Sequence, residues 1–440
     1  MEMKGRRYWI EYAKDKWEEM NHVMVKDYEK IFKHLFLQLI EKYLKIVLVD
    51  SIHEKNIEKK YPLFLKKFEK QIEIESFFVS EVYNNLIHDQ QRLNNVFRGD
   101  YTKLKKIECL NSDLHNNGKC VLKFVFQKNK LIYKPRGLSM DKAWDAFSRK
   151  LFTYIDGRWG VIQSIDCITY GWQTYIEYKT VQTTEEISRY YYNFGSLAAV
   201  LYILNGTDFH EENVIVFRDK PYILDLETLL QNTEYSVRNN GISTIFDTAL
   251  FCAKRRGMDI SSYSGMDTEN KYNLIQFGNQ YIKPYDYLNE TIRGFWETGV
   301  KILENIEFVT ELVKRCFSWT YSRIIIRDTL IYDTVQKNMF KRMALSSDSS
   351  YEYKKKAYWK YLNADIRLDE IIESEMYSLE NGDIPYFSLN STERQLKCNN
   401  KLLNVFYRLS PLENVLQKIN NFSFMELRKQ EILLVKLNTE

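Results

Sequence analysis

Oxygen-bearing side chains gather between residues 205 and 227, in the stretch NGTDFHEENVIVFRDKPYILDLE, at spacings that suit phosphoryl transfer. Asp208 and Asn213 are predicted to lie in a loop, and Asp225 comes at the end of the strand that follows. This chemistry needs a carboxylate to orient the attacking hydroxyl and separate oxygen ligands for the Mg²⁺ that accompanies ATP. Protein kinases use the same order, Asp, Asn, Asp, in their catalytic loop and metal-binding segment. We therefore predict an ATP and magnesium site, with Asn213 and Asp225 as metal ligands.

Each of these three residues also has an ordinary structural explanation when it is taken alone. Asp208 would cap a turn, Asn213 would begin a strand and Asp225 would be a surface carboxylate. The combination is harder to explain in this way. A hairpin of otherwise apolar strands has little reason to place Asp225 after Tyr222-Ile-Leu unless the carboxylate is paired or ligating.

A phosphate-binding lysine should lie upstream on a strand, and Lys134 has that position at the end of KLIYK, just before Pro135-Arg136. The neighbouring Arg136 would reinforce the binding of an anion. Neither the glycine-rich kinase loop GxGxxG nor the P-loop pattern GxxxxGK[ST] occurs in the sequence. An ordinary protein kinase or P-loop enzyme is therefore disfavoured.

The elements that must position these residues change in kind along the chain. Residues 1–100 have apolar residues at helical spacing and are predicted to form a helical N-terminal region. Residues 101–182 contain strand-like runs such as CVLKFVFQ and are predicted to form a β-rich lobe. A long apolar helix opens a second lobe, residues 183–330, and residues 331–440 are predicted to be helical. The predicted fold class is therefore α+β, with a β-rich lobe, a second lobe that is mainly helical and additional helices at both ends.

Composition excludes several functional classes. The chain has 63 Lys and Arg against 59 acidic residues, and its net charge of +4 is too small to indicate nucleic acid binding. The six cysteines form no CxxC pair and no Cys-His cluster, which indicates reduced thiols and no zinc site. We recognise no signal peptide and no apolar run that is long enough to span a bilayer. We therefore expect no membrane insertion and a cytoplasmic location.

Eight ordered blocks of the sequence resemble the dehydratase domain of class II lanthipeptide synthetases, the LanM type. The resemblance runs from about residue 75 to the end of the chain. Its blocks are SDLHNNGKCV (112–121), LIYKPR (131–136), YGW (170–172), NGTDFHEENVIV (205–216), PYILDLETLL (221–230), RIIIRDT (323–329), DIPYFSL (383–389) and SPLENVL (410–416).

This resemblance implies a two-lobed core similar to lipid kinases, which uses ATP and Mg²⁺ to phosphorylate Ser and Thr of a ribosomal precursor peptide. The same site would then eliminate phosphate to give dehydroalanine and dehydrobutyrine. The implied partner is a precursor peptide with a leader and a core rich in Ser, Thr and Cys.

The resemblance also implies roles for individual residues. For phosphorylation, these are the phosphate-contacting Lys134, the hydroxyl-orienting Asp208, its loop companion His210, the metal ligands Asn213 and Asp225, and Glu227 as the second carboxylate of the D-x-E pair. For phosphate elimination, they are Arg323, Thr329, Asp113 and His115. Expelling phosphate requires that its charge be stabilised, so a cation such as Arg323 is expected near the leaving group. The base that removes the α-proton stays unassigned.

Some of the elimination residues have structural alternatives. Arg323 and Thr329 flank a segment in which residues 324–326 would build core, and His115 would be a hydrogen-bonded loop histidine. Only the resemblance favours a catalytic role for them.

Class II synthetases usually continue into a cyclase that holds zinc with cysteines and histidine. No histidine follows His210 here, so we expect ring closure to need a separate cyclase protein. The leading hypothesis is a standalone lanthipeptide dehydratase. Its alternatives are a peptide Ser/Thr kinase without elimination and a non-catalytic subunit that presents the precursor peptide.

Overall fold

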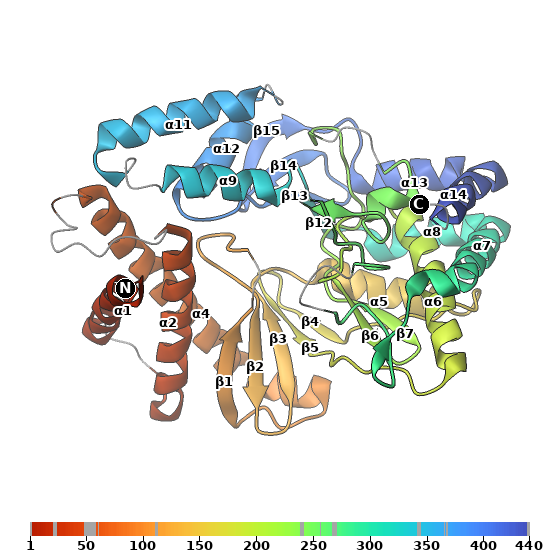
Figure 1. The fold of residues 1–440 in the computed structure, drawn as a ribbon, viewed down its shortest axis with the longest axis horizontal. Coiled ribbons are helices and arrows are strands. Elements are labelled where there is room, and N and C mark those ends of the chain that lie inside the picture. Colours follow the sequence, from red (N-terminus) through yellow and green to blue (C-terminus); the bar gives the residue numbers. More distant parts are fainter. Residues whose placement is uncertain are drawn as a thin grey trace.

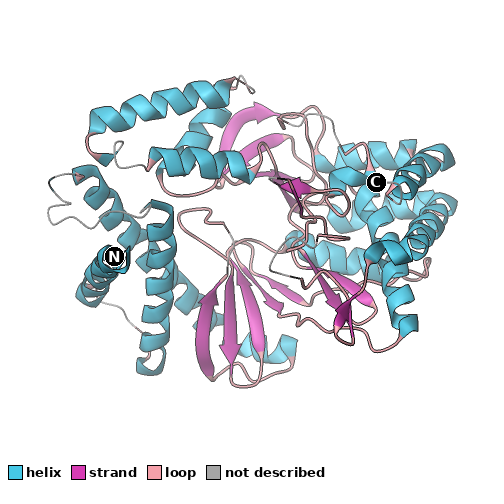
Figure 2. Ribbon diagram, viewed as in Figure 1, coloured by secondary structure: helices cyan, strands magenta, loops and turns pink. Residues whose placement is uncertain are grey.

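Helices gather at the two ends of the molecule, and antiparallel sheets lie between them (Figures 1 and 2). The N-terminal helices α1 (Glu2–Glu19), α2 (Lys26–Val47) and α4 (Pro62–Phe97) form one end, and the C-terminal helices α13 (Pro411–Asn421) and α14 (Phe424–Lys436) belong to the other. The computed structural model describes residues 2–20, 24–47, 59, 61–110, 113–237, 242–255, 257–265, 271–340, 345–364, 366 and 368–437.

An antiparallel five-stranded sheet with the order β1-β2-β3-β5-β4 follows the N-terminal helices. Alternation along the strands directs Phe124, Tyr133 and Trp172 into one hydrophobic core, which they share with the apolar faces of α2 and α4. Helix α5 (Ser139–Leu151) comes between the third and fourth strands of the chain. The strands are β1 (Leu104–Cys109), β2 (Leu122–Phe126), β3 (Lys130–Lys134), β4 (Ser164–Asp166) and β5 (Gly171–Thr174).

A buried carboxylate ties this sheet to helix α4. Asp89 accepts hydrogen bonds of 2.8 Å from the hydroxyl of Tyr170 and from Nε1 of Trp172. We expect Asp89→Ala to lower the free energy of unfolding by roughly 2–4 kcal/mol, because two buried donors lose their acceptor. Chemical denaturation measures this loss. Glu73→Ala, at an exposed position of the same helix, should change stability little, and equal losses for both variants would refute this account.

The second lobe is built around helix α6 (Thr184–Ile203), which is buried along most of its length. The helix begins where the sequence predicts, and the hydroxyl of Thr183 accepts a hydrogen bond from the backbone N–H of Glu186. Helix α7 (Leu288–Glu304) packs against it so closely that a Cβ on Gly195 would lie 1.8 Å from the carbonyl oxygen of Thr291. This contact therefore requires a glycine.

Further helices and short hairpins complete this lobe. Helix α8 (Ile306–Phe317), together with α13 and α14, contributes to the same hydrophobic core as α6. The hairpin of β6 and β7 holds the segment in which the metal ligands are predicted. The remaining elements are β6 (Val214–Phe217), β7 (Lys220–Ile223), β8 (Lys254–Arg255), β9 (Met258–Asp259), β10 (Gln276–Phe277), β11 (Gln280–Tyr281) and the 3₁₀ helices η1 (Ile245–Thr248) and η2 (Pro284–Tyr287).

Residues 331–440 are mostly helical in the part that the structure describes, as predicted, but the prediction did not include their strands. They supply β13 (Phe387–Asn390), β14 (Gln395–Cys398) and β15 (Lys401–Phe406), which extend β12 (Tyr321–Ile324) into an antiparallel four-stranded sheet. The apolar run that becomes β13 in the DIPYFSL block is too short to be recognised as a strand in the sequence. Its pairing with β12 decides its structure. The helices of this part are α9 (Thr329–Met339), α11 (Asp348–Asn363) and α12 (Asp369–Glu380).

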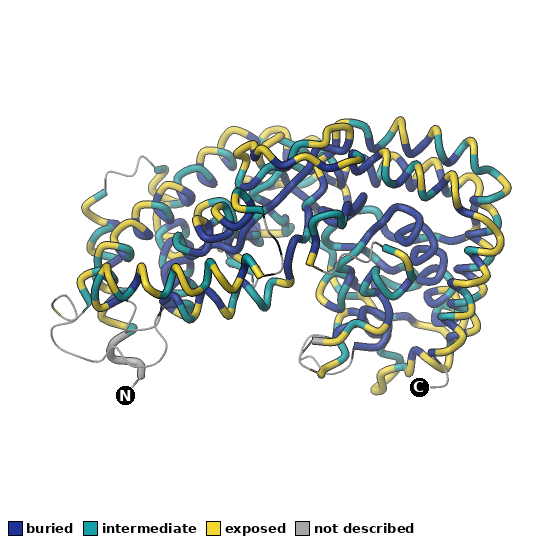
Figure 3. The backbone as a smooth tube through the Cα atoms, turned by 90° about the horizontal axis from the view of Figure 1, so that it is seen from above, coloured by how far each residue is buried: buried dark blue, intermediate teal, exposed yellow. Residues whose placement is uncertain are grey.

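Buried segments run through the middle of the molecule, whereas exposed positions mark the outer turns of the helices (Figure 3). Within the described ranges, no helix is both long enough and apolar enough to cross a membrane.

Candidate functional site

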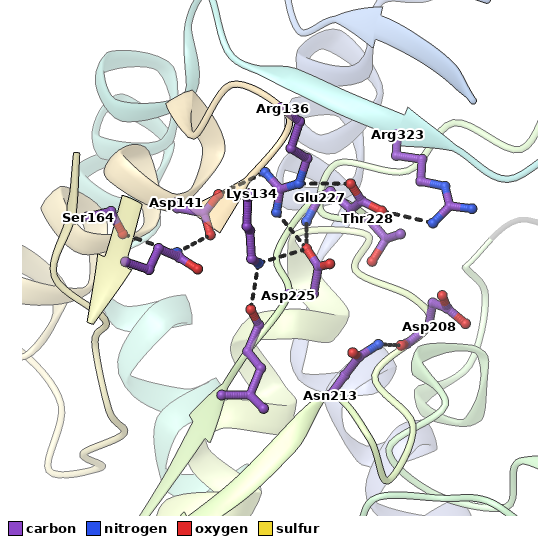
Figure 4. Close-up of polar contacts among 12 residues, drawn as sticks. Lys134, Arg136, Asp141, Ser164, Asp208, Asn213, Asp225, Glu227, Thr228 and Arg323 are labelled. Carbon is purple, nitrogen blue, oxygen red and sulfur yellow. Dashed lines mark hydrogen bonds and ion pairs between the residues drawn. The ribbon is translucent and has the colours of Figure 1, made fainter. Parts of the chain in front are cut away.

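Lys134, the last residue of β3, lies against the segment that follows β7 (Figure 4). Its Nζ donates a 2.7 Å hydrogen bond to the carbonyl oxygen of Leu224 and lies 3.5 Å from Oδ1 of Asp225. Only 5% of the lysine side chain is exposed, which is unusual for an ammonium group unless it is paired. The end of β3 in the first lobe and the end of the β6–β7 hairpin in the second therefore place a cation against the predicted metal ligand.

Arg136 lies at the centre of the charged cluster. Its Nη2 donates to Oδ1 of Asp225 at 2.6 Å, and its Nε lies 2.9 Å from Oε2 of Glu227. Its Nη1 donates to Oδ2 of Asp141 on α5 at 3.0 Å. Asp141 is in turn held by Nε2 of Gln173 at 2.8 Å. Arg136 thus fixes the two carboxylates of the D-x-E pair, Asp225 and Glu227, relative to the five-stranded sheet and α5.

These contacts keep the cluster ionised. Burial alone would raise the pKa of Asp225, but the ammonium of Lys134 and the guanidinium of Arg136 outweigh it and hold that pKa well below its usual range. Burial would lower the pKa of Arg136, but the surrounding carboxylates, first of all Asp225, raise it above its ordinary value. At neutral pH the site therefore holds fixed charges of both signs.

The loop after α6 carries Asp208, His210 and Asn213. Asp208 has a φ of 65°, in the left-handed region that residues other than glycine seldom adopt and that is found more often at functional sites. Nδ2 of Asn213 donates a 2.8 Å hydrogen bond to the carbonyl oxygen of Asp208 and lies 3.3 Å from Nε2 of His210. The N–H of Leu224 donates to the carbonyl oxygen of Asn213 at 2.9 Å, so the loop is fixed to the end of the hairpin.

The pKa of His210 reflects the acidic surroundings of this loop. Burial would lower it, but the carboxylates of Glu211 and Asp208 raise it above the ordinary value for histidine.

Strand β12 brings Arg323 to the other side of the D-x-E pair. Its backbone N–H donates to the carbonyl oxygen of Glu227 at 2.7 Å, and its Nη1 donates to Oε1 of the same residue at 2.8 Å. The hydroxyl of Tyr386 donates to Oε2 of Glu227 at 3.1 Å, and the guanidinium of Arg323 lies 5.5 Å from the centroid of the Tyr386 ring. Burial would lower the pKa of Arg323, but the carboxylates of Glu227 and Asp208 raise it. The phosphorylation and elimination sets are therefore linked through Glu227.

The loop that carries Asp113 and His115 joins the site from the first lobe. Nδ1 of His115 lies 2.7 Å from the carbonyl oxygen of Ile384, so this nitrogen carries the proton. The imidazole ring lies 5.6 Å from the ring of Tyr386. Asp113 is exposed beside it. The hydrogen bond to Ile384 places His115 at the edge of the cluster rather than inside it.

Two backbone N–H groups in the same loop bind a buried carboxylate. Asn117 and Gly118 donate to Asp383 at 2.6 and 2.8 Å. Burial raises the pKa of Asp383 to about 6, although these bonds lower it. The HNNG turn of the first lobe is thus fixed to the DIPYF segment that carries Tyr386.

His115 should make stability depend on pH. Burial, together with the charge of Arg323, lowers its pKa from 6.5 to about 4. The folded protein therefore binds this proton less tightly than the unfolded chain, so stability is lost as pH falls from 6.5 towards 4. The difference in unfolding free energy between wild type and His115→Gln should shrink by roughly 3 kcal/mol over that range. Denaturation at several pH values measures it, and a difference that stays constant would contradict the assignment.

A cleft of about 580 Å³, a size typical of ligand sites, lies beside this cluster. Asp208 and His210 line it from the loop after α6, and Arg323 lines it from β12. Thr329, the first residue of α9, also lines it. The cleft therefore brings residues predicted for phosphorylation together with residues predicted for elimination.

The structure thus brings most of the predicted site residues together. Lys134, Asp225, Glu227 and Arg323 form one continuous cluster through Arg136. The remaining predicted residues lie around it: Asp208, His210 and Asn213 in the loop after α6, Thr329 in the cleft wall, and His115 with Asp113 at the outer edge.

Sequence reasoning missed the positions of two important residues. Arg136 was expected only to reinforce anion binding beside Lys134, and Tyr386 was only part of the DIPYFSL block. Both interact with Glu227. The position of Arg136 two residues after the predicted lysine was the available signal for the first, whereas nothing local marks the second.

The donor atoms at the predicted metal position suit Mg²⁺. All the contacts of Asp225 within the described ranges use Oδ1, so Oδ2 stays open, and Oδ1 of Asn213 accepts no hydrogen bond from a described residue. A carboxylate and an amide oxygen are the hard ligands that Mg²⁺ prefers, with phosphate oxygens and water completing the shell. Among the described residues, no group of three or more His, Cys, Asp and Glu side chains forms a metal centre.

Comparison with known proteins identifies the family. A family model described as "Domain of unknown function (DUF4135)" matches residues 61–251 and 253–390, which is more than half of the chain. The chain belongs to this family. The DUF4135 match covers the five-stranded sheet, the loop after α6, the D-x-E pair, strand β12 with Arg323 and the segment with Tyr386 that precedes β13.

A characterised relative has a name that indicates its pathway. The chain is 26% identical over 384 residues to the "Lacticin 481/lactococcin biosynthesis protein LcnDR2" of Lactococcus lactis subsp. lactis. The match covers 75% of this chain and 41% of the relative, so the chain spans less than half of the length of that protein. The two comparisons support the resemblance to lanthipeptide synthetases.

Proposed function

We propose that this DUF4135 protein dehydrates Ser and Thr of a ribosomal precursor peptide, first by ATP-dependent phosphorylation and then by elimination of phosphate. The observation that carries the proposal is one cleft lined by both Asp208 and Arg323, in which Arg323 is linked to Asp225 through Glu227 and Arg136. The relative named for lacticin 481 and lactococcin biosynthesis supports the pathway. We further propose that the two lobes form a kinase-like core.

Phosphorylation would depend on the first set of residues. Bound ATP with Mg²⁺ supplies the phosphoryl group and a divalent cation, which Asn213 and Asp225 would hold. Lys134 would contact phosphate, and Arg136 would keep the D-x-E carboxylates in place. Asp208 lines the cleft and would orient the hydroxyl of the substrate residue.

Elimination would depend on the second set. The phosphate leaves as an anion when the α-proton is removed, so a fixed cation next to the leaving group lowers the barrier. Arg323 supplies that cation, and its guanidinium is held by Glu227 and faces the ring of Tyr386. The hydroxyl of Thr329 lies in the same cleft wall and would donate to the phosphate. A kinase without elimination has no need for this second set.

Mass spectrometry tests the proposal. The protein is incubated with ATP, Mg²⁺ and Ser/Thr-rich precursor peptides, including the precursor of lacticin 481. Successive losses of one water per modified residue are expected. A stable gain of phosphate would instead favour a peptide Ser/Thr kinase. Unchanged peptide under all conditions, together with product formation by a partner enzyme that needs this chain, would favour a presenting subunit.

A further inference from the structure

A second cleft, of about 450 Å³, adjoins the cleft that holds Arg323. The walls of the two share Gln231, Thr233 and Ile242, so the two clefts are neighbours. Gln231 fixes their relative position, because its Nε2 donates to the carbonyl oxygen of Arg323 at 2.6 Å and its Oε1 accepts from the N–H of Ile325 at 3.1 Å. The second cleft is thus tied to the strand that carries the elimination cation.

Side-chain amides make up much of the wall of this second cleft. Asn205 lines it from the buried side, and Gln417 and Asn421 line it from the exposed rim; none of their side chains makes a hydrogen bond with a described residue. Asn205 is only 5% exposed, and a buried amide usually has a partner. Each amide offers donors and an acceptor, the set that pairs with the N–H and C=O groups of an extended peptide backbone.

The charges in this wall argue against a phosphate or nucleotide ligand. Nζ of Lys418 donates to the carbonyl oxygens of Tyr202 and Ile242 at 2.6 and 2.9 Å. Nε of Arg408 lies 3.3 Å from Oε1 of Glu234. Lys418 is therefore engaged, and the mostly exposed Arg408 has a carboxylate beside it. Among the described lining residues none is aromatic and able to stack on a base.

We propose that this amide-lined cleft binds the backbone of the peptide segment next to the Ser or Thr that is being modified. The inference rests on the proposed function, because the reacting residue would lie in the adjoining cleft with Asp208 and Arg323. Backbone recognition would explain how one site could accept successive residues of a peptide, since main-chain groups are the same at every position.

The test compares a long and a short synthetic peptide that contain the same Ser. The long peptide extends well beyond this Ser on both sides, and the short one keeps only its immediate neighbours. Gln417→Ala and Asn421→Ala should each raise the KM for the long peptide roughly two- to tenfold, with kcat unchanged, because each removes a hydrogen bond made equally in ground and transition states. The KM for the short peptide should not change.

Asn420→Ala is the matched control, since Asn420 is an exposed residue on the same helix that lines neither cleft. Anisotropy titration of the fluorescently labelled long peptide without ATP measures affinity independently of turnover. If the wild type binds but does not modify the peptide, the proposed function fails. The affinities of the variants then still test whether the amide-lined cleft binds the peptide. Equal affinity of wild type, Gln417→Ala and Asn421→Ala for the long peptide, or equal losses for both peptides, would overturn the inference.

Discussion

Asp225→Asn is expected to abolish peptide phosphorylation, with a loss of at least about 10³-fold in kcat/KM. The carboxylate offers Oδ2 as an open oxygen, while its Oδ1 is held by Arg136 and Lys134. An amide has the same shape but no charge, so it would bind a divalent cation weakly and would leave the two basic side chains without their counter-charge. Mass spectrometry of the peptide after incubation with ATP and Mg²⁺ measures both phosphate gain and water loss.

The control for this variant lies in the same hairpin. Asp219→Asn makes the same chemical change in the turn between β6 and β7, away from the charged cluster, and should keep nearly wild-type activity. Thermal unfolding and the affinity for the long peptide show whether Asp225→Asn is still folded. A folded Asp225→Asn variant with activity within about tenfold of wild type would exclude Asp225 as a metal ligand.

The parts of the site that lie on one stretch of sequence could be predicted. Asp208, Asn213 and Asp225 are set by a loop and a two-residue turn, so their spacing alone indicates that they meet. The prediction of Lys134 required one further step of reasoning, namely that phosphoryl transfer also uses a phosphate-binding lysine on a preceding strand. The structure brings it to 3.5 Å from Asp225, a contact that no local pattern specifies.

The rest of the site depends on tertiary pairing. Tyr386 reaches Glu227 because β13 pairs with β12 in a register that sets Arg323 opposite Ser388. A four-residue strand carries too little periodicity to be recognised, and this is also why no strand was predicted within residues 331–440. The amide-lined cleft is harder still to predict, since its walls come from the end of α6, the segment after β7 and helix α13.

Arg323→Met is expected to separate the two half-reactions. Dehydrated product should fall by about 10²–10³-fold, because the departing phosphate loses a fixed cation in a largely buried site. Phosphorylation should fall by less than about tenfold, since Lys134 and Arg136 still hold Asp225. The phosphopeptide, which is the proposed intermediate, should therefore accumulate, and a synthetic phosphopeptide supplied as substrate measures the elimination step by itself.

Arg394→Met is the matched control, because Arg394 is exposed and pairs with Glu413 away from the cleft. Arg323→Lys gives a second comparison, since lysine keeps the charge but cannot both bind Glu227 and present a planar guanidinium to Tyr386. If Arg323 acts only by holding Glu227 in place, Arg323→Met will slow both half-reactions equally and no phosphopeptide will accumulate. If instead phosphopeptide accumulates with Arg323→Met and elimination is partly restored with Arg323→Lys, the cation itself stabilises the leaving phosphate.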